Sequence, residues 1–118
     1  VSESIIDEKK MILEGIIDSV SEEKKEKIYQ LFNEGFSKLD NEMIRTIEVF
    51  FRCGLNLSDA AKELYIHRNT LIYRLDKIEK YTGYDIRNFN NAVLFQVVYY
   101  IWKEKMHGKP MMLLKMKS

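Results

Sequence analysis

Between residues 67 and 80 the sequence gathers side chains that can bind DNA bases and attract phosphate. Residues 68–82 are expected to form a helix. Leu71, Leu75 and Ile78 give this helix one apolar face, and a rotation of about 100° per residue places Asn69, Tyr73 and Lys77 opposite Leu71. Asparagine can pair with adenine and arginine with guanine, while lysine attracts phosphate in a salt-dependent way. The polar face of this helix, its flank and its N-terminal end carry His67, Arg68, Asn69, Thr70, Tyr73, Arg74, Asp76, Lys77 and Lys80. Such a set is typical of a recognition helix that enters the major groove.

The same periodicity would also suit an ordinary surface helix with a solvated polar face. Asp76 and Glu79 lie on this helix and weaken its positive potential. From the pattern alone, DNA binding and a plain solvated face both stay open.

Other kinds of chemistry have little support in the sequence. His67 and His107 are far apart, and no acidic pair lies at ligand spacing from either, so we predict no metal site. Cys53 is the only cysteine and has no evident catalytic partner, so we expect a buried structural thiol. No glycine-rich phosphate loop or catalytic constellation is present, and we predict no enzyme activity and no cofactor. For His67 a helix-capping role and a phosphate contact both stay open.

The elements that would position this polar face form a helix-turn-helix between Leu57 and Gly83. Ser58 is expected to cap a short first helix that ends near Leu64. Ala60 and Ala61 are small enough to let two helices cross closely. Residues 65–67 form the tight connection, and Gly83 suits a left-handed C-cap of the second helix.

The stretch from Leu57 to Glu79 closely resembles the C-terminal helix-turn-helix of the PucR family, which includes the CdaR-like sugar-diacid regulators. The most specific segments are His-Arg-Asn-Thr-Leu at 67–71 and Tyr-Arg-Leu at 73–75. The resemblance extends from about Leu39 to Trp102. More distantly, the arrangement of the two helices resembles the Fis-type helix-turn-helix.

This resemblance implies sequence-specific binding to double-stranded DNA, usually as a homodimer or larger assembly, with an upstream region that senses a small molecule. The residues that it implies at the DNA are His67, Arg68, Asn69, Thr70, Tyr73, Arg74 and Lys77, and Ser58 could also contact phosphate. Position 72 is often arginine in the family, whereas this chain has Ile72, which removes a cation beside the DNA and could alter the preferred site.

Composition favours an all-α helical bundle, in which the resemblance implies a Fis-like helix-turn-helix core with an N-terminal helical extension. The chain has 118 residues, and one proline and five glycines are few breakers for that length. We expect three segments: a helical arm at 1–38 (a possible linker or dimerisation region), the DNA-binding domain at 39–105 and a basic tail at 106–118. The net charge of only +1 is a weak argument for nucleic acid. A protein-interaction or dimerisation module that keeps the fold without tight DNA binding is therefore the alternative function.

The two ends of the chain carry further expectations. The apolar run at 92–102 predicts a buried helix over about 91–105, ended by Gly108 and Pro110, with a strand as the alternative. Apolar pairs at 5–6, 12–13 and 16–17 could form a dimer arm or pack on the core, and we favour packing because the pattern lasts barely two heptads.

The expected location is the cytoplasm. A single cysteine fits a reducing compartment, and the longest apolar run is too short to span a bilayer, so no membrane is expected as a partner. The chain opens with Val1, and we interpret it as a piece of a longer protein that lacks its effector-sensing region.

Overall fold

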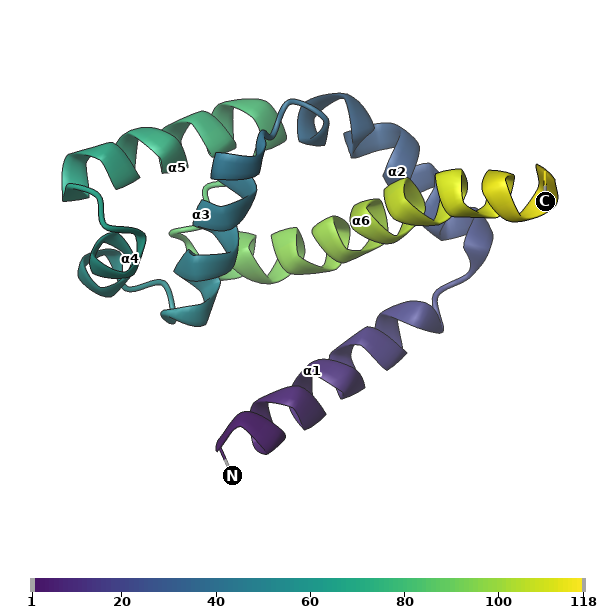
Figure 1. The fold of residues 1–118 in the computed structure, drawn as a ribbon, viewed down its shortest axis with the longest axis horizontal. Coiled ribbons are helices and arrows are strands. Elements are labelled where there is room, and N and C mark those ends of the chain that lie inside the picture. The colour runs from purple at the N-terminus through teal and green to yellow at the C-terminus, as the bar shows by residue number, and fades with distance from the viewer. Residues whose placement is uncertain (1, 118) are drawn as a thin grey trace.

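The computed structural model describes the backbone of residues 2–117 and the side chains of residues 8–107. The described residues form six helices and no strand: α1 (Ser2–Asp18), α2 (Glu22–Phe36), α3 (Asn41–Arg52), α4 (Leu57–Leu64), α5 (Arg68–Thr82) and α6 (Phe89–Lys117). The predicted all-α fold is therefore confirmed. Helices α2 to α6 form one body, with α3, α4 and α5 grouped at one end, while α1 leaves this body as an arm (Figure 1).

Polar side chains define where several helices begin. The Asp40 carboxylate accepts a hydrogen bond from the Met43 amide at 2.8 Å and caps α3. The expected cap of α4 is wrong, because Ser58 lies inside the first turn and Asn56 caps the helix instead, accepting from the Asp59 amide at 2.9 Å.

The reason for this difference lies in the backbone before α4. Asparagine and serine are similar N-cap residues, so side-chain type does not decide between them. Gly54 and Leu55 both adopt positive φ angles of 64° and 66°, and this turn leaves Asn56 extended directly before the first helical residue.

An aromatic and aliphatic core joins α2, α3, α5 and α6. Its largest fully buried side chains include Phe36, Ile47, Phe50, Leu71, Leu75, Ile78, Ile86 and Phe95. Phe95 stacks on Phe36 and on Tyr99, with ring centroids 5.3 Å and 5.4 Å away. This packing holds α6 against α2, while Leu71, Leu75 and Ile78 bring α5 into the same cluster.

The last helix is longer than the sequence predicts. It begins at Phe89 and continues to Lys117, so the expected end at Gly108 and Pro110 is wrong. Both residues weaken a helix, proline by about 3 kcal/mol and glycine by about 1 kcal/mol, but these are energetic costs and not prohibitions. The side chains beyond His107 lie outside the described part, and the three segment boundaries stay predictions.

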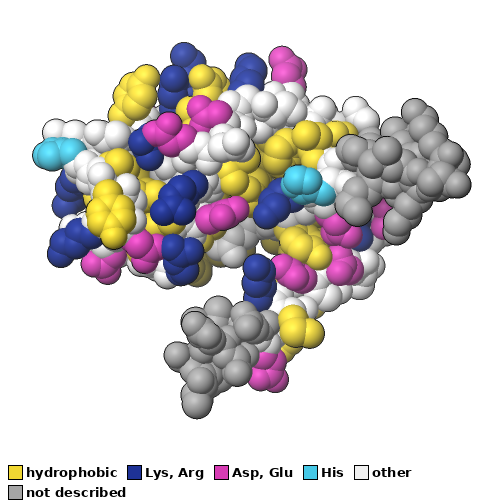
Figure 2. Space-filling model, in the orientation of Figure 1, with side chains coloured by type: hydrophobic (Ala, Val, Ile, Leu, Met, Phe, Trp, Pro, Cys, Tyr) yellow, Lys and Arg dark blue, Asp and Glu magenta, His cyan; other side chains and the backbone are white. Residues whose placement is uncertain are grey.

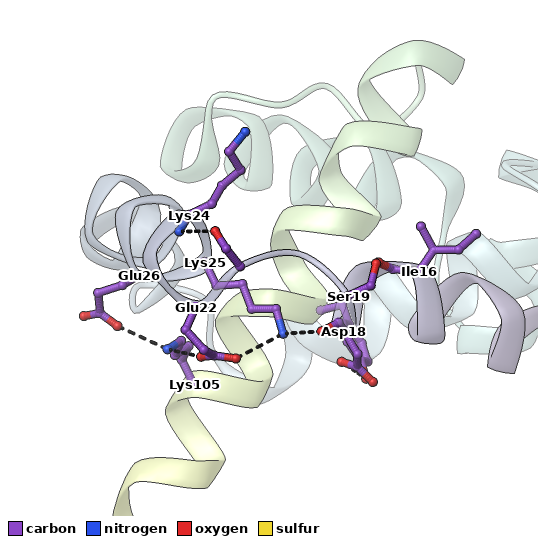
Figure 3. Close-up of polar contacts among 10 residues, drawn as sticks. Ile16, Asp18, Ser19, Glu22, Lys24, Lys25, Glu26 and Lys105 are labelled. Atoms are coloured by element: carbon purple, nitrogen blue, oxygen red, sulfur yellow. Dashed lines mark hydrogen bonds and ion pairs between the residues drawn. The ribbon is translucent and has the colours of Figure 1, made fainter.

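The apolar stripe of α1 does not pack on the core, in contrast to the favoured expectation. Among the described side chains of α1 only Ile17 is buried, whereas Ile12, Leu13 and Ile16 are exposed. The predicted apolar pair at 5–6 lies outside the described side chains. The arm is anchored at its C-terminal end, where the buried Lys25 ammonium donates to the Asp18 carbonyl at 3.2 Å (Figure 3). The Tyr100 hydroxyl also lies 3.2 Å from the Asp18 carboxylate. The short turn at 19–21 directs α1 away from the body, so a helical period alone did not reveal its position.

Candidate nucleic-acid interface

Helices α4 and α5 form the predicted helix-turn-helix. Tyr65 ends α4 in the left-handed conformation, at φ 56° and ψ 42°. The Ile66 amide then donates to the Ala61 carbonyl at 3.0 Å, and His67 is the N-cap of α5. Ala60 and Ala61 are buried where α4 approaches its neighbours, which confirms the predicted role of these small residues.

Helix α5 has one buried and one exposed face. Leu71, Leu75 and Ile78 are fully buried, as their spacing predicts. The first turns expose Arg68, Asn69, Thr70 and Tyr73, and the Tyr73 side chain is 60% accessible. Dark blue Lys and Arg side chains lie along the edge of the molecule over α5 in Figure 2. The exposed N-terminal half of α5 is therefore held in place by a fully packed inner face.

Arg74 does not share this exposed face. Its guanidinium forms an ion pair with Glu42 of α3, and a second nitrogen donates to the Thr46 hydroxyl at 3.4 Å. Its side chain is 18% accessible. The sequence groups Arg74 with the DNA-facing residues, but the structure places it between α5 and α3.

The acidic residues of α5 pair with a cation from outside the helix, Arg87, and not with the cations of α5 itself. Arg87, in the turn before α6, lies 2.8 Å from the Asp76 carboxylate and 3.5 Å from that of Glu79. Its Nε also donates to Asp85 at 2.6 Å. Burial raises the pKa of Asp85, but its hydrogen bonds with Arg87 outweigh this effect and hold the pKa below its usual range.

The cations of α5 are left available by this arrangement. Arg68 and Lys80 form no ion pair with any described residue. The Lys77 ammonium lies 5.5 Å from the centroid of the Tyr73 ring. Hydrogen bonding to Tyr73 raises the pKa of Lys77, so the side chain remains positively charged. Of the four cations of α5, only Arg74 therefore forms an ion pair within the part of the chain whose side chains are described.

Comparison with protein families gives a match over residues 43–101 to the PucR C-terminal helix-turn-helix domain. The matched segment covers half of the chain and includes α4 and α5 completely. The chain belongs to this family. The resemblance on which the sequence analysis depends is thereby confirmed.

Relatives of this PucR-type domain are parts of much longer proteins. The carbohydrate diacid regulator of Escherichia coli is 39% identical over 52% of the chain, which is 16% of that protein. The purine catabolism regulatory protein of Bacillus subtilis is 39% identical over 42% of the chain and 9% of its own length.

A solved structure shares the fold. The crystal structure of a regulator of polyketide synthase expression from Bifidobacterium adolescentis superimposes with a TM-score of 0.58 and 27% identity. The match covers 69% of the chain and 32% of the solved one. The chain therefore spans less than a third of each of these proteins.

In the PucR-type domain, His67 has a definite local role. Its Nδ1 accepts a hydrogen bond from the Asn69 amide at 3.0 Å, so the ring caps α5. A neutral ring that accepts at Nδ1 carries its proton on Nε2, and this outward N–H remains available as a donor. Capping and phosphate contact, which the sequence left as alternatives, are thus compatible in one tautomer.

For two residues of the domain, the role in the structure differs from the one that the sequence indicated. Ser58 is exposed in the first turn of α4, where its hydroxyl can still reach a ligand although it does not cap the helix. Arg87 was missed, because its partners Asp76 and Glu79 lie 11 and 8 positions away on another element. The signal for Arg87 in the sequence is a cation in a turn that follows a helix with acidic residues. This pattern is too common to have identified Arg87.

The remaining reactive groups show no assembled site. No group of three or more His, Cys, Asp or Glu that could hold a metal ion is found in the described residues. Cys53, expected to be buried, is half-buried at the C-cap of α3, and burial raises the pKa of its thiol. None of the described helices is long and apolar enough to cross a membrane.

Proposed function

We propose that this chain binds double-stranded DNA sequence-specifically and reads the major groove with the N-terminal half of α5. The observation that carries the proposal is the contrast between the two faces of that helix. Leu71, Leu75 and Ile78 are fully buried, while Arg68, Asn69 and Tyr73 project into solvent from the first turns. A rigid helix with exposed hydrogen-bonding groups at its N-terminal end has the form required for base recognition.

Each exposed side chain has a matching chemical partner on DNA. The Asn69 amide can form two hydrogen bonds with adenine, and the Arg68 guanidinium can do the same with guanine. The hydroxyls of Ser58, Thr70 and Tyr73 can donate to phosphate oxygens, as can Nε2 of His67. Lys77 and Lys80 would supply salt-dependent attraction to the backbone.

At the level of the whole protein, the proposal is a bacterial transcription regulator that acts in the cytoplasm. The names of the relatives support it, since they are called a carbohydrate diacid regulator and a purine catabolism regulatory protein. Binding as a homodimer to two half-sites, and control by an effector-sensing region outside this chain, complete the proposal. It includes no catalytic step and no cofactor.

The second candidate is a protein-interaction module that keeps the fold without tight DNA binding. The net charge of +1 and the apolar Ile72 favour it. Asp76 argues for it less strongly than the sequence suggests, because that carboxylate pairs with Arg87 and not with a cation of α5.

Selection from a pool of random DNA duplexes at two salt concentrations tests the proposal. Asn69→Ala should erase the enriched motif. Asn90→Ala is a matched control, because Asn90 is also an exposed asparagine at the second position of a helix, α6. Salt-sensitive binding without a motif would contradict sequence-specific reading. Absence of binding by both the wild-type chain and a covalently forced dimer would favour the interaction module.

A further inference from the structure

Helix α1 presents an apolar ridge that the described residues leave uncovered. Ile12 and Ile16, four residues apart and hence on one face, are 59% and 61% accessible, and Met11 and Leu13 are exposed beside them. A cluster of large apolar side chains on one exposed helix differs from the scattered single residues of an ordinary surface and indicates an interaction site.

The ridge borders a groove of about 960 Å³ between α1 and the body. Ile17 of α1, Phe51 of α3 and Tyr99 of α6 contribute apolar lining. An occupant that offers apolar side chains would bury this lining together with the ridge.

The charges around the groove identify the kind of occupant. Both signs are present, in Lys10, Glu14, Glu48, Lys103 and Glu104, and none of the five forms an ion pair within the described part of the chain. Hydrophobic atoms lie among dark blue and magenta side chains on the side of the body that faces α1 (Figure 2). A nucleic acid would require cations, and a strongly acidic or basic peptide would require one sign only. A surface that meets its own copy must be self-complementary. A rim that carries both signs of charge meets this requirement, because each sign can face its opposite on the second copy.

The anchoring of α1 gives the ridge a defined direction. Lys25, buried at the α1–α2 junction, bonds to the last carbonyl of α1 and lies 3.4 Å from Glu22, while Glu22 also pairs with Lys105 of α6 (Figure 3). The arm leaves the body on the side away from α5 (Figure 1). Contacts made through α1 would therefore leave the recognition helix uncovered.

We propose that two copies of this chain associate through α1, with the Ile12–Ile16 ridge of one copy seated in the groove between α1 and α6 of the other. Each α1 carries Glu8, Lys9, Lys10 and Glu14, so it offers both signs of charge to the mixed rim of its partner. The role of this dimer in DNA binding rests on the proposed function, because two DNA half-sites require a pair of recognition helices.

Sedimentation equilibrium of the 118-residue chain, from about 1 to 500 µM, tests the dimer. The wild-type chain should show a concentration-dependent monomer–dimer equilibrium. Ile16→Lys should weaken dimerisation at least tenfold, because it places a charge in the apolar contact. Leu31→Lys is the control, since Leu31 is 75% accessible on α2 and lies outside the groove. Both substitutions are at exposed sites, and circular dichroism checks that the helices remain.

A cross-linking experiment examines the same contact directly. In a Cys53→Ala background, mild oxidation of a mixture of an Ile16→Cys and a Gln96→Cys variant should give a disulfide between the two copies, because Gln96 is an exposed residue of the groove, whereas Leu31→Cys mixed with Gln96→Cys should not. A wild-type chain that stays monomeric over the whole range overturns the inference, as does a dimer that Ile16→Lys leaves intact.

The DNA selection separates this inference from the proposed function. A monomeric chain that still enriches a DNA motif would overturn the α1 dimer and leave DNA reading standing. A dimer with the expected sensitivity to Ile16→Lys that binds no duplex would support the α1 contact and contradict DNA reading.

Discussion

At the scale of single residues, the main finding is that two arginines of one helix have different surroundings. Arg68 is exposed at the start of α5 and forms no ion pair among the described residues. Arg74, less than two turns later, is directed toward α3 by Glu42 and Thr46. Guanidinium groups serve DNA binding and helix packing equally well, so the neighbours decide which role each one takes.

Substitution of the two arginines should separate these roles. Arg68→Ala should leave the free energy of unfolding unchanged and weaken binding to the selected DNA by about 1–3 kcal/mol, because it removes a base-pairing group. Arg74→Ala should lower the free energy of unfolding by about 1–3 kcal/mol, because Glu42 and Thr46 lose a charged partner in a partly buried site.

Urea unfolding and DNA titrations at several salt concentrations measure both effects. The salt dependence of binding should be unaffected by Arg74→Ala. If Arg74→Ala instead lowered the slope of the log binding constant against log salt concentration by about 1, Arg74 would contact phosphate, which would contradict a packing role. Lys24→Ala, at an exposed lysine of α2, controls for loss of charge alone.

Asp85 should make stability depend on pH in acid. The pKa of Asp85 in the folded chain is held below the unfolded value of about 3.9. The ionised carboxylate therefore stabilises the fold above that pH, and this contribution is lost as the pH falls through the folded pKa. Asp85→Asn should destabilise the chain by about 1 kcal/mol at pH 7, and the difference from wild type should shrink below about pH 4. Thermal unfolding from pH 2 to 8 measures it. An equal loss with Glu34→Gln, at an exposed carboxylate of α2, would contradict the assignment to Asp85.

At the scale of elements, the position of α5 depends on a close approach to α2. A Cβ atom placed on Gly35 would lie 2.0 Å from the Tyr81 carbonyl oxygen, and the next nearest atoms are also backbone. A backbone group cannot move aside like a flexible side chain. Glycine at this position therefore lets the C-terminal part of α5 pack directly against α2.

Gly35→Ala should lower the free energy of unfolding by about 1–3 kcal/mol, because the two helices must separate to admit a methyl group. Chemical denaturation compares it with Gly15→Ala, since a Cβ on Gly15 of α1 meets nothing within 4 Å. The control should be neutral or stabilising by up to about 1 kcal/mol, as expected for alanine in an open helix. Equal effects of the two substitutions would show that helix propensity, and not the α2–α5 contact, is responsible.

At the scale of the whole molecule, the direction of the α1 arm depends on a few contacts at one end. The Lys25 side chain is only 7% accessible, and its ammonium lies at the negative C-terminal end of α1. The charges of Glu22 and Lys105 connect this junction to α6. Loss of the junction should free the arm without unfolding the body, because α1 contributes little to the main core.

Lys25→Met keeps the apolar stem and removes the charge that holds the Asp18 carbonyl. Hydrogen exchange over residues 8–18 should become about tenfold faster, while exchange over α3 to α5 stays unchanged. Lys27→Met is the control, because Lys27 is an exposed lysine of the same helix whose ammonium lies 3.5 Å from Glu23. Unchanged protection of α1 in Lys25→Met would show that other contacts hold the arm.

Much of the helix-turn-helix could be predicted from the sequence because its signals are local. The span of α5 from Arg68 to Thr82, its left-handed Gly83 C-cap and its buried face of Leu71, Leu75 and Ile78 all follow from periodicity and turn chemistry. The segments His-Arg-Asn-Thr-Leu and Tyr-Arg-Leu indicated the family that the comparison shows. Such signals depend on neighbours within about one helical turn, and these are adjacent in the sequence.

The sequence did not determine which side chains meet across helices. Arg74 reaches Thr46 and Glu42 over 28 and 32 positions, and Arg87 reaches Asp76 over 11. The exposure of Ile12 and Ile16 likewise depends on the direction in which the turn at 19–21 sends α1. The relative position of two helices is set by the packing of many side chains at once, so only the tertiary structure decided these contacts.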